Sequence, residues 1–332
     1  MKLLYPNSLV FDAGSLEGFG VSLHQYDVHK PIPEELIDAE IIVTWANTNL
    51  SDAAKRMRNL RWIQSLFAGP NDVLAAGFSP DIKVTAGTNL HDETVTEHAL
   101  ALLLSAARKL YEMRDYQNQG KWPGHLGGFQ PDRPRGSFTS LKGANILIWG
   151  MGNIGRKIAP HLIALGANVR GVGLFDEIID GIQVQTNDAL PKVLPQTDAV
   201  IMILPGSKAT FHALNGERMK LLPNHAWVIN VGRGTCVDED ALAQALHART
   251  LGGAALDVLH TEPLHASSPL WKAPNLILSP HAAGGKPRYS EALVAENLRR
   301  FLAGQPLKHD VSAGGMYAAA PPENKPALKA SL

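Results

Sequence analysis

Short apolar runs alternate with amphipathic stretches along most of the chain. In the first 90 residues such runs lie at 2–5, 21–26, 40–45, 62–66 and 83–85. They are too short for helices and rich in β-branched and aromatic side chains, so they predict buried strands. Loops and helical patterns separate them. The alternation predicts a small parallel α/β unit at the start of the chain.

A second set of apolar runs lies at 146–149, 169–172, 199–203, 226–231, 254–258 and 276–278. Helical patterns stand between most of these runs, which predicts a doubly wound parallel sheet. A further helix predicted over 288–302 should return the chain to the first unit. Residues 313–332 are rich in Ala, Pro and Lys, and they are expected to form either a disordered tail or an arm on a neighbouring subunit.

One long helix is predicted between the two sets of runs. Its apolar positions recur at helical spacing at Val95, Ala99, Leu102, Leu103, Ala106 and Leu110. Residues 94–97 read TVTE, which has the capping-box pattern and predicts that the helix starts there. The Gly- and Pro-rich segment 120–136 that follows predicts an irregular crossover.

Composition excludes several classes of protein. The formal net charge is +0 and no block of Lys or Arg stands out, so nucleic acid and anionic membranes are poor candidate partners. The single cysteine, Cys236, rules out an intrachain disulfide and a cysteine metal site, and we expect no metal. It suits a reducing compartment, so we expect a cytoplasmic protein. The N-terminus lacks the pattern of a signal peptide, and no apolar run is long enough to span a membrane.

The most informative segment is the turn after residue 149. Gly150, Gly152 and Gly155 have the G-x-G-x-x-G spacing, with an apolar run before them and an amphipathic helix pattern after them, at Ile158, Leu162 and Leu165. The glycines are expected to allow, in order, a tight turn, close backbone approach to a pyrophosphate, and close helix–strand packing. The backbone N–H groups near Asn153 and Ile154 would then face the phosphates. The turn therefore predicts a dinucleotide site.

Three polar residues directly follow strands of the second set: Arg233, Glu262 and His281. Ligands of open α/β sheets bind at the carboxyl ends of the strands, where these residues should meet. A histidine suits proton transfer near neutral pH, and a neighbouring carboxylate would fix its tautomer. An arginine can hold a substrate carboxylate with a planar pair of donors. The set fits hydride transfer to a 2-keto acid, with the nicotinamide supplying the hydride.

The chain resembles the D-isomer-specific 2-hydroxyacid dehydrogenase family over nearly its whole length. The matching blocks are TEH at 96–98, GMGNIG at 150–155, LPGS at 204–207 with Thr210, VGRG at 231–234, LDV at 256–258 with EPL at 262–264, and PHAAG at 280–284. The resemblance implies two Rossmann-like domains. A doubly wound dinucleotide-binding domain, 96–285, would be inserted into a smaller flavodoxin-like substrate domain, 1–95 and 286–332.

The resemblance also implies roles for residues. Arg233 would bind substrate, His281 would act as acid and base, Glu262 would be its partner, and Asp257 would meet the nicotinamide carboxamide. The backbone of 66–71, at Ala68 and Gly69, would hold the substrate carboxylate. Together with the glycine turn, the expected cofactor contacts are Thr96, Gly150, Gly152, Asn153, Ile154, Gly155, Gly173, Asp176, Leu204, Pro205, Thr210, Val231, Gly232, Arg233, Asp257, His281, Ala283 and Gly284. Relatives are mostly dimers, so a homodimer is expected.

The chain departs from the family pattern at the end of the second strand of the nucleotide domain. NAD enzymes usually carry there an acidic residue that binds the ribose, and this chain has Gly173. The following residues, 174–177, read LFDE and offer no Arg or Lys to a 2′-phosphate. Asp176 could reach the ribose instead, so NAD is favoured, with NADP as the alternative. Thr96 stands where many relatives carry alanine, and it would either contact the cofactor or cap the helix.

The substrate is the least determined part of the prediction. Trp45, on a loop of the first domain, would leave room only for small acids, which resembles the glyoxylate and hydroxypyruvate reductases; it could equally be an ordinary half-buried aromatic. Trp122 and Trp271 are further candidates near the substrate. Three alternatives stay open: a phosphoglycerate dehydrogenase-type substrate, a non-enzymatic NAD(H)-sensing protein resembling corepressors on this scaffold, and formate oxidation. Formate fits worst, because those enzymes pair the histidine with glutamine.

Overall fold

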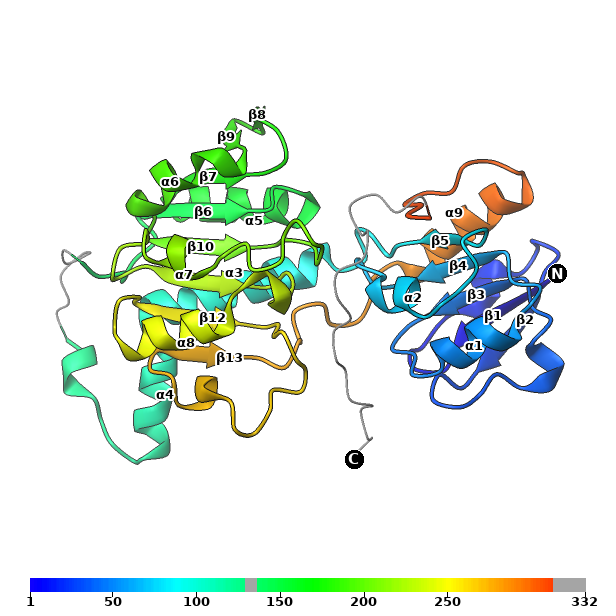
Figure 1. Cartoon of the computed structure of the whole chain (residues 1–332), viewed down its shortest axis with the longest axis horizontal. Coiled ribbons are helices and arrows are strands. Elements are labelled where there is room, and N and C mark those ends of the chain that lie inside the picture. Colours follow the sequence, from blue (N-terminus) through cyan, green and yellow to red (C-terminus); the bar gives the residue numbers. More distant parts are fainter. Residues whose placement is uncertain (129–135, 313–332) are drawn as a thin grey trace. The chain divides into compact units, whose positions relative to one another are not determined.

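The computed structural model describes residues 1–128 and 136–312 (Figure 1). Within them the chain divides into two compact units. Unit 1 comprises Met1–His91 and residues 285–312, and unit 2 comprises Asp92–Gly284. Residues 129–135 of the predicted crossover and the tail at 313–332 lie outside the described residues. Among the described residues, no helix has both the length and the apolar character that a membrane span needs.

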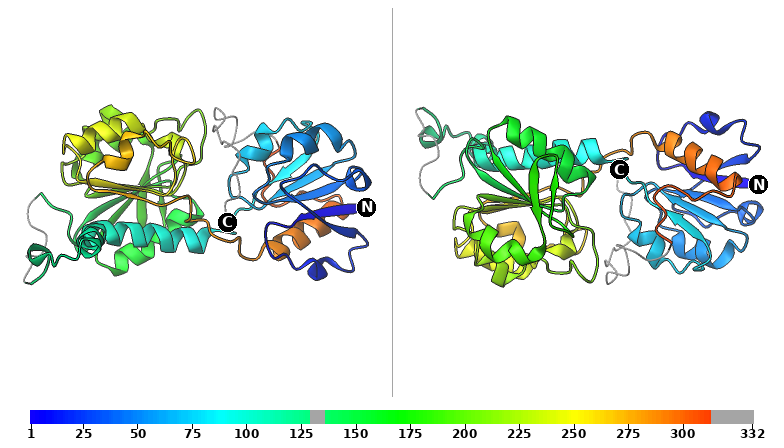
Figure 2. Two further views of the ribbon diagram at one scale, coloured as in Figure 1. Left: turned by 90° about the horizontal axis from the view of Figure 1, so that it is seen from below. Right: turned by 90° about the horizontal axis from the view of Figure 1, so that it is seen from above.

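Unit 1 is built on a five-stranded parallel sheet in the order β2-β1-β3-β4-β5. The strands are β1 (Lys2–Pro6), β2 (Ser22–Tyr26), β3 (Ile41–Thr44), β4 (Trp62–Ser65) and β5 (Lys83–Thr85). They confirm the strands predicted from the first set of apolar runs. Helices α1 (Leu50–Arg56) and α2 (Asn71–Ala75) cover one face, and α9 (Ser290–Leu302) covers the other (Figure 2).

Helix α9 completes unit 1 although it comes from the far end of the chain. Val294 and Leu298 are fully buried against Leu3 and Ile41 of the sheet. Its buried Asn297 donates a 2.8 Å hydrogen bond to the side-chain oxygen of Gln64 on β4. The helix begins two residues later than predicted, because Tyr289 has a left-handed backbone with φ of 62°.

Unit 2 contains an eight-stranded sheet in the order β13-β12-β11-β10-β6-β7-β9-β8. The strands that correspond to the predicted runs are β6 (Asn145–Trp149), β7 (Asn168–Val172), β10 (Ala199–Met202), β11 (Trp227–Asn230), β12 (Gly253–Leu256) and β13 (Leu276–Leu278). They are mutually parallel, and the chain runs outward from β6 in opposite directions on its two sides. The topological switch point therefore lies between β6 and β10, where α/β sheets bind ligands.

The hairpin of β8 (Glu177–Ile179) and β9 (Ile182–Gln185) was not predicted. β9 lies parallel to β7, and β8 returns antiparallel at the edge of the sheet. Between them Asp180 and Gly181 both have positive φ, 52° and 81°. Asp-Gly between apolar residues is a strong hairpin signal, so the sequence contained the turn although its strands are too short to stand out.

Helices cover both faces of this sheet (Figure 2). The apolar sides of α3 (Asp92–Arg108) and α5 (Asn153–Ala164) share one core with the sheet, and α6 (Leu190–Val193), α7 (Gly216–Met219) and α8 (Glu239–His247) share the other. Short 3-10 helices complete the structure at Ala13–Leu16, Glu34–Leu36, Gly124–Leu126, Asn187–Ala189, Leu194–Gln196, Gly234–Cys236 and Pro269–Lys272.

Both ends of the long helix differ from the prediction. α3 begins at Asp92, so Thr94 lies inside it, and its hydroxyl donates to the carbonyl oxygen of Gly284 instead of capping the helix. Lys109, with a left-handed φ of 54°, ends the helix before Leu110, which is 52% exposed and starts α4 (Leu110–Asn118). In α5, Leu165 was expected to face the core, but it lies past the end of the helix and is exposed.

Candidate active site

The glycine turn has the geometry that its spacing predicts. Gly150 has φ of 114°, and a Cβ there would lie 2.6 Å from the carbonyl oxygen of Ile203. A Cβ at Gly155 would lie 2.5 Å from the carbonyl oxygen of Gly150. These two glycines are required by the tight turn and by the close approach of α5 to β6, and both packing predictions are confirmed.

Gly152 differs from its neighbours, because a Cβ there would meet no atom within 4 Å. Its φ of −78° is one that any residue adopts. It is the N-cap of α5, and the first turn of that helix carries no acidic side chain. The space beside Gly152 is therefore open at the positive end of the helix dipole, a setting that fits a pyrophosphate. Asn153 and Ile154 form that first turn.

Close glycine contacts connect this turn to the loops after the next strands. A Cβ at Gly232 would lie 2.6 Å from the nitrogen of Leu204, so the loops after β10 and β11 touch. A Cβ at Gly234 would lie 1.9 Å from the carbonyl carbon of Leu259, so the loop that carries Arg233 packs directly on the loop that carries Glu262. The predicted blocks therefore meet along one edge of the sheet.

Glu262 and His281 form the most direct contact of the site. One carboxylate oxygen of Glu262 lies 2.7 Å from Nδ1 of His281, and the other accepts the N–H of Leu259 at 3.0 Å. The His281 side chain is 39% exposed and that of Glu262 24%. Because Nδ1 faces the carboxylate, Nε2 is the ring nitrogen left for another partner.

Arg233 lies on the adjoining loop. Asn230 shapes this loop, since its side chain donates to the carbonyl of Arg233 at 3.0 Å and accepts the N–H of Gly232 at 3.1 Å. The guanidinium donates to the carbonyl of Gly232 at 2.8 Å. The structure thus brings Glu262 and His281 into contact and places Arg233 on the loop packed against them.

Asp257, which was expected to contact the cofactor, accepts hydrogen bonds from the loop that carries His281. It is 1% exposed, and its two carboxylate oxygens accept the N–H groups of Ala282 at 2.8 Å and Ala283 at 2.9 Å. Its carbonyl accepts the N–H of His281 at 2.8 Å. His281 itself has φ of 53°, a conformation that L residues rarely adopt. Beyond it, Ala283 is buried and Gly284 half-buried.

The loop after β10 carries further expected cofactor residues. The hydroxyl of Thr210 donates to the carbonyl of Pro205 at 2.5 Å and accepts the N–H of Ser207 at 2.9 Å. This closes a compact turn beside Leu204 at the switch point. Val231, at the end of β11, is buried.

The end of β7 explains the departure from the family pattern. A Cβ at Gly173 would lie 3.1 Å from Cγ1 of Val184 on β9, so a larger side chain there would press on the hairpin. Asp176 accepts the backbone N–H of Thr186 at 2.8 Å through one carboxylate oxygen, which ties the hairpin to the loop. The residue as a whole is exposed.

Three threonine hydroxyls of unit 2 are buried without a hydrogen-bond partner among the described residues, those of Thr96, Thr139 and Thr235, and Thr96 and Thr235 are buried as whole residues. Thr96 and Thr235 are 5% and 2% exposed, and neither hydroxyl has a hydrogen-bond partner within residues 1–128 and 136–312. Buried polar groups are rarely left unpaired, so such hydroxyls suit contact with a ligand. Thr96 was predicted. Thr235 was missed, although its place two residues after Arg233 in a loop at a strand end was the available signal.

The expected substrate residues of unit 1 lie at the ends of β3 and β4. The ring of Trp45 stacks on Phe67, with centroids 4.2 Å apart, and on His91, with centroids 5.4 Å apart. Ala68 and Gly69 are half-buried in the loop that begins after β4. In unit 2, Trp122 and Trp271 are 94% and 56% exposed.

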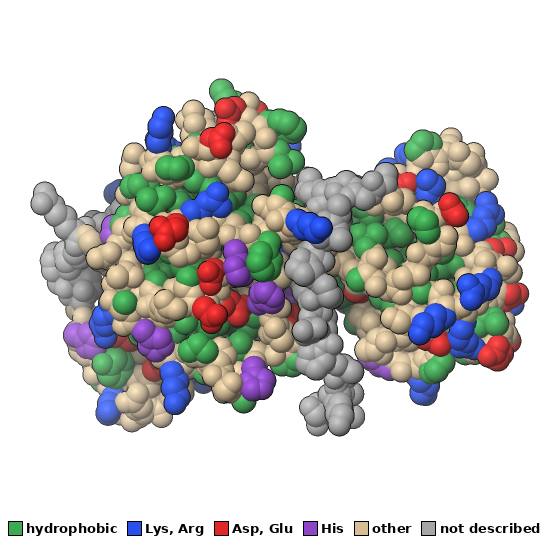
Figure 3. Space-filling model, in the orientation of Figure 1, with side chains coloured by type: hydrophobic (Ala, Val, Ile, Leu, Met, Phe, Trp, Pro, Cys, Tyr) green, Lys and Arg blue, Asp and Glu red, His purple; other side chains and the backbone are tan. Residues whose placement is uncertain are grey.

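A second carboxylate lies near the Glu262 loop. Glu239, the first residue of α8, accepts the N–H of His260 at 2.5 Å. Burial raises the pKa of the Glu239 carboxyl, against the lowering effect of this hydrogen bond, and the Glu262 charge adds to the rise. Histidine and acidic side chains gather on one face of unit 2 (Figure 3). His212 lies 4.0 Å from Asp238, the residue before Glu239. The residues described contain no group of His, Cys, Asp or Glu suited to a metal ion.

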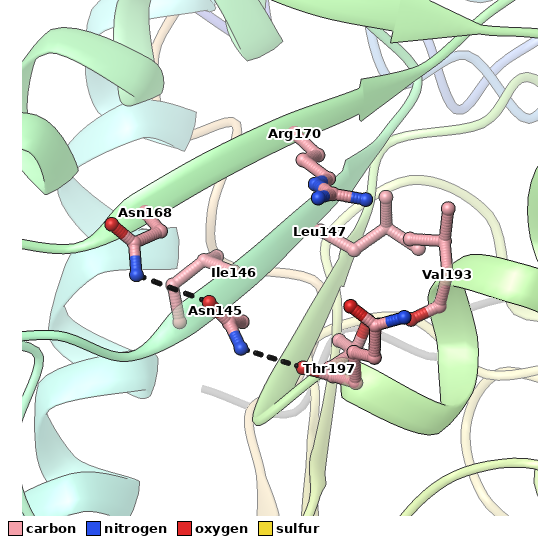
Figure 4. A pocket seen from close by; sticks show the side chains of 8 residues that line it. Asn145, Ile146, Leu147, Asn168, Arg170, Val193 and Thr197 are labelled. Atoms are coloured by element: carbon pink, nitrogen blue, oxygen red, sulfur yellow. Dashed lines mark hydrogen bonds between the residues drawn. The ribbon is translucent and has the colours of Figure 1, made fainter.

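A separate pocket lies toward the amino-terminal ends of β6 and β7. Its lining includes Asn145 on β6, Asn168 and Arg170 on β7, and Thr197 (Figure 4). The lining residue nearest the glycine turn along β6 is Leu147, three residues before Gly150, so roughly 10 Å of strand separates the pocket from the turn. The pocket is therefore distinct from the site assembled above.

The comparisons with known proteins agree on one family. Residues 100–283 match the model of the D-isomer specific 2-hydroxyacid dehydrogenase NAD binding domain. The glycerate dehydrogenase of Methylorubrum extorquens is 29% identical over 85% of this chain and 91% of its own. The glyoxylate reductase of Korarchaeum cryptofilum is 29% identical over 84% of this chain and 76% of its own. A D-isomer specific 2-hydroxyacid dehydrogenase of Xanthobacter autotrophicus, solved with NADPH and MES, superposes with a TM-score of 0.77 at 27% identity, covering 93% of this chain and 97% of that one.

Proposed function

The chain belongs to the D-isomer-specific 2-hydroxyacid dehydrogenase family and is an NAD(P)-dependent oxidoreductase, and on this premise we propose that it reduces small 2-keto acids of the glyoxylate and hydroxypyruvate type. The observation that carries the proposal is the 2.7 Å contact between Glu262 and His281. Glycine contacts join this pair, through the Arg233 loop, to the dinucleotide turn. The names of the glycerate dehydrogenase and glyoxylate reductase relatives support the substrate class.

The residues of unit 2 fit a nicotinamide dinucleotide. The open space at Gly152 and the first-turn amides of α5 would receive the pyrophosphate, and the unpartnered hydroxyl of Thr96 offers a polar contact. When bound, the nicotinamide supplies or accepts the hydride. The other contacts expected from the sequence stay predictions.

His281 is proposed to move the proton. As C2 of the keto acid becomes tetrahedral, its oxygen takes a proton from Nε2 of the imidazolium, and in the oxidative direction the hydroxyl returns it. Glu262 at Nδ1 orients the ring, so that Nε2 faces the substrate. Arg233 is proposed to hold the substrate carboxylate, because a guanidinium binds it through two parallel hydrogen bonds.

Substrate size is proposed to be limited by unit 1. Trp45 is held by Phe67 and His91, so its ring has little freedom to make room for a larger acid. Ala68 and Gly69 are proposed to offer backbone N–H groups to the substrate carboxylate.

We propose that NAD is preferred over NADP. Gly173 removes the usual ribose-binding carboxylate, but the next residues include Asp176 and Glu177, whose charges would repel a 2′-phosphate. The nearest arginine after the glycine turn, Arg156, is paired with Asp180 at 3.1 Å.

We also propose a cytoplasmic homodimer joined through unit 2. Helix α4 buries none of its side chains, and Trp122 beyond it is 94% exposed. An exposed tryptophan in the loop after a helix that has no fully buried side chain is a feature that a second copy of the chain would cover.

Steady-state kinetics test the proposed function. NADH and NADPH oxidation would be followed with glyoxylate, hydroxypyruvate, pyruvate and phosphohydroxypyruvate. We expect turnover with the first two at a kcat/KM at least tenfold above that of the others, and faster turnover with NADH. A preference for phosphohydroxypyruvate would overturn the substrate class. Binding of NADH without turnover of any keto acid would overturn the enzyme assignment in favour of a sensor.

A further inference from the structure

Two side chains of α3 reach the loop that carries His281. Thr94 donates through its hydroxyl to the carbonyl oxygen of Gly284 at 2.8 Å. Nε2 of His98 lies 2.9 Å from the hydroxyl oxygen of Ser279. Thr94 and His98 are four residues apart, so they project from the same face of the helix. They contact the loop on both sides of His281.

The direction of the hydrogen bond between His98 and Ser279 follows from the second hydrogen bond of Ser279. The Ser279 hydroxyl donates its only proton to a carboxylate oxygen of Asp257 at 2.6 Å, so its oxygen is left to accept from Nε2–H of His98. Nε2 also lies 3.2 Å from the same Asp257 oxygen. His98, Ser279 and Asp257 thus form a continuous polar cluster beneath the loop.

This cluster fixes a backbone that is not intrinsically favoured. Asp257 holds the amides of Ala282 and Ala283 through its side chain and that of His281 through its carbonyl. His281 has a left-handed φ of 53°. A histidine keeps such a conformation only where its surroundings impose it, and the direction of its ring toward Glu262 depends on that conformation.

We propose that His98 is a positioning residue of the reaction, which acts through Ser279 and Asp257 to hold the His281 imidazole against Glu262, with Thr94 securing the other side of the loop. The inference rests on the proposed function. It assigns a role to a residue of the TEH block whose side chain no step of the reaction uses.

Substitution of His98 tests the proposal in the full-length enzyme with saturating NADH. His98→Leu removes the donor, and His98→Gln keeps an N–H near the position of Nε2. We expect His98→Leu to lower kcat at least tenfold, with the Kd for NADH within twofold of wild type by fluorescence titration. We expect His98→Gln to restore kcat to within threefold. Glu97→Gln, on the exposed side of the same helix, is the matched control and should leave kcat unchanged.

The outcomes separate the two proposals. If the wild type turns over no keto acid, the proposed function fails first. If the wild type is active, two results would overturn the positioning role. One is that His98→Leu folds and keeps a kcat within twofold of wild type. The other is that His98→Gln has a kcat as low as that of His98→Leu. Should His98→Leu not fold, Thr94→Val removes a single hydroxyl from the same face, and an unchanged kcat in that variant overturns the role of α3.

Discussion

At the scale of single residues, the His281 ring presents Nδ1 to Glu262, which leaves Nε2 for the proton transfer that we propose. We expect His281→Ala to lower kcat by about 10²–10⁴, because general acid–base catalysis contributes this much. Single-turnover and steady-state rates with saturating keto acid would measure it. His265→Ala, in an exposed loop, is the control. A loss below threefold in His281→Ala would contradict the proton-transfer role.

Gly152 and Gly155 form a second test at this scale, because added methyl groups meet different surroundings. At Gly152 the methyl meets no protein atom, so the free energy of unfolding of Gly152→Ala should stay within about 0.5 kcal/mol of wild type. The same variant should bind NADH at least tenfold more weakly. At Gly155 the methyl would lie 2.5 Å from the carbonyl oxygen of Gly150, so Gly155→Ala should lower the melting temperature.

Calorimetric unfolding and NADH titration of both variants would separate the two roles. Wild-type affinity for NADH in Gly152→Ala would show that the open space there does not receive the cofactor. Unchanged stability in Gly155→Ala would contradict the packing role.

The grouping of candidate residues was predictable where their place after a strand was enough. Arg233, Glu262 and His281 each follow an apolar run, and parallel strands bring such positions to one edge, where Glu262 contacts His281. The hydrogen bonds of Asp257 and the unpartnered hydroxyl of Thr235 were not predictable, since they depend on which loops meet in space.

At the scale of elements, helix α8 carries the half-buried Glu239 at its first residue. Burial raises the pKa of this carboxyl in the folded protein, so the folded state is favoured when the group is protonated. Its stabilising contribution is complete below the unfolded pKa of about 4.3 and is lost as the pH rises through the folded value.

Glu239→Gln has no carboxyl group at this position, so it should not lose this stabilising contribution as the pH rises. We expect the melting temperature of Glu239→Gln, relative to wild type, to rise between pH 4 and pH 7, as measured by circular dichroism. Asp240→Asn, at the exposed neighbouring position, should show a smaller pH dependence. A difference between Glu239→Gln and wild type that stays constant over this range would contradict the burial effect.

Elements were predictable where the apolar pattern was strong, and their ends were not. The strand 83–85 was predicted with its observed bounds. The capping-box pattern placed the start of α3 too late, because Thr94 bonds to Gly284 across the fold, a partner that local sequence does not reveal. The end at Lys109 depends on a left-handed residue without glycine, for which the sequence carries no signal.

At the scale of the whole molecule, the proposed homodimer depends on the segment around α4. We expect Trp122→Ser to shift the protein from dimer to monomer at micromolar concentration, because the tryptophan would lose its place in an apolar interface. Light scattering after size-exclusion chromatography measures this. Tyr289→Ser, exposed on unit 1, is the control. A Trp122→Ser variant that stays dimeric would show that the interface lies elsewhere. A monomeric wild type would overturn the proposed homodimer.

The position of α9 has a consequence for biosynthesis. Val294 and Leu298 cover Leu3 and Ile41, and Asn297 pairs with Gln64, so strands made first lack one of their covering layers until a helix made some 230 residues later arrives. Unit 2 is complete in sequence before that moment. On the ribosome, the inserted unit is therefore expected to fold first, while the opening 91 residues wait with an apolar face uncovered and depend on chaperones for that interval.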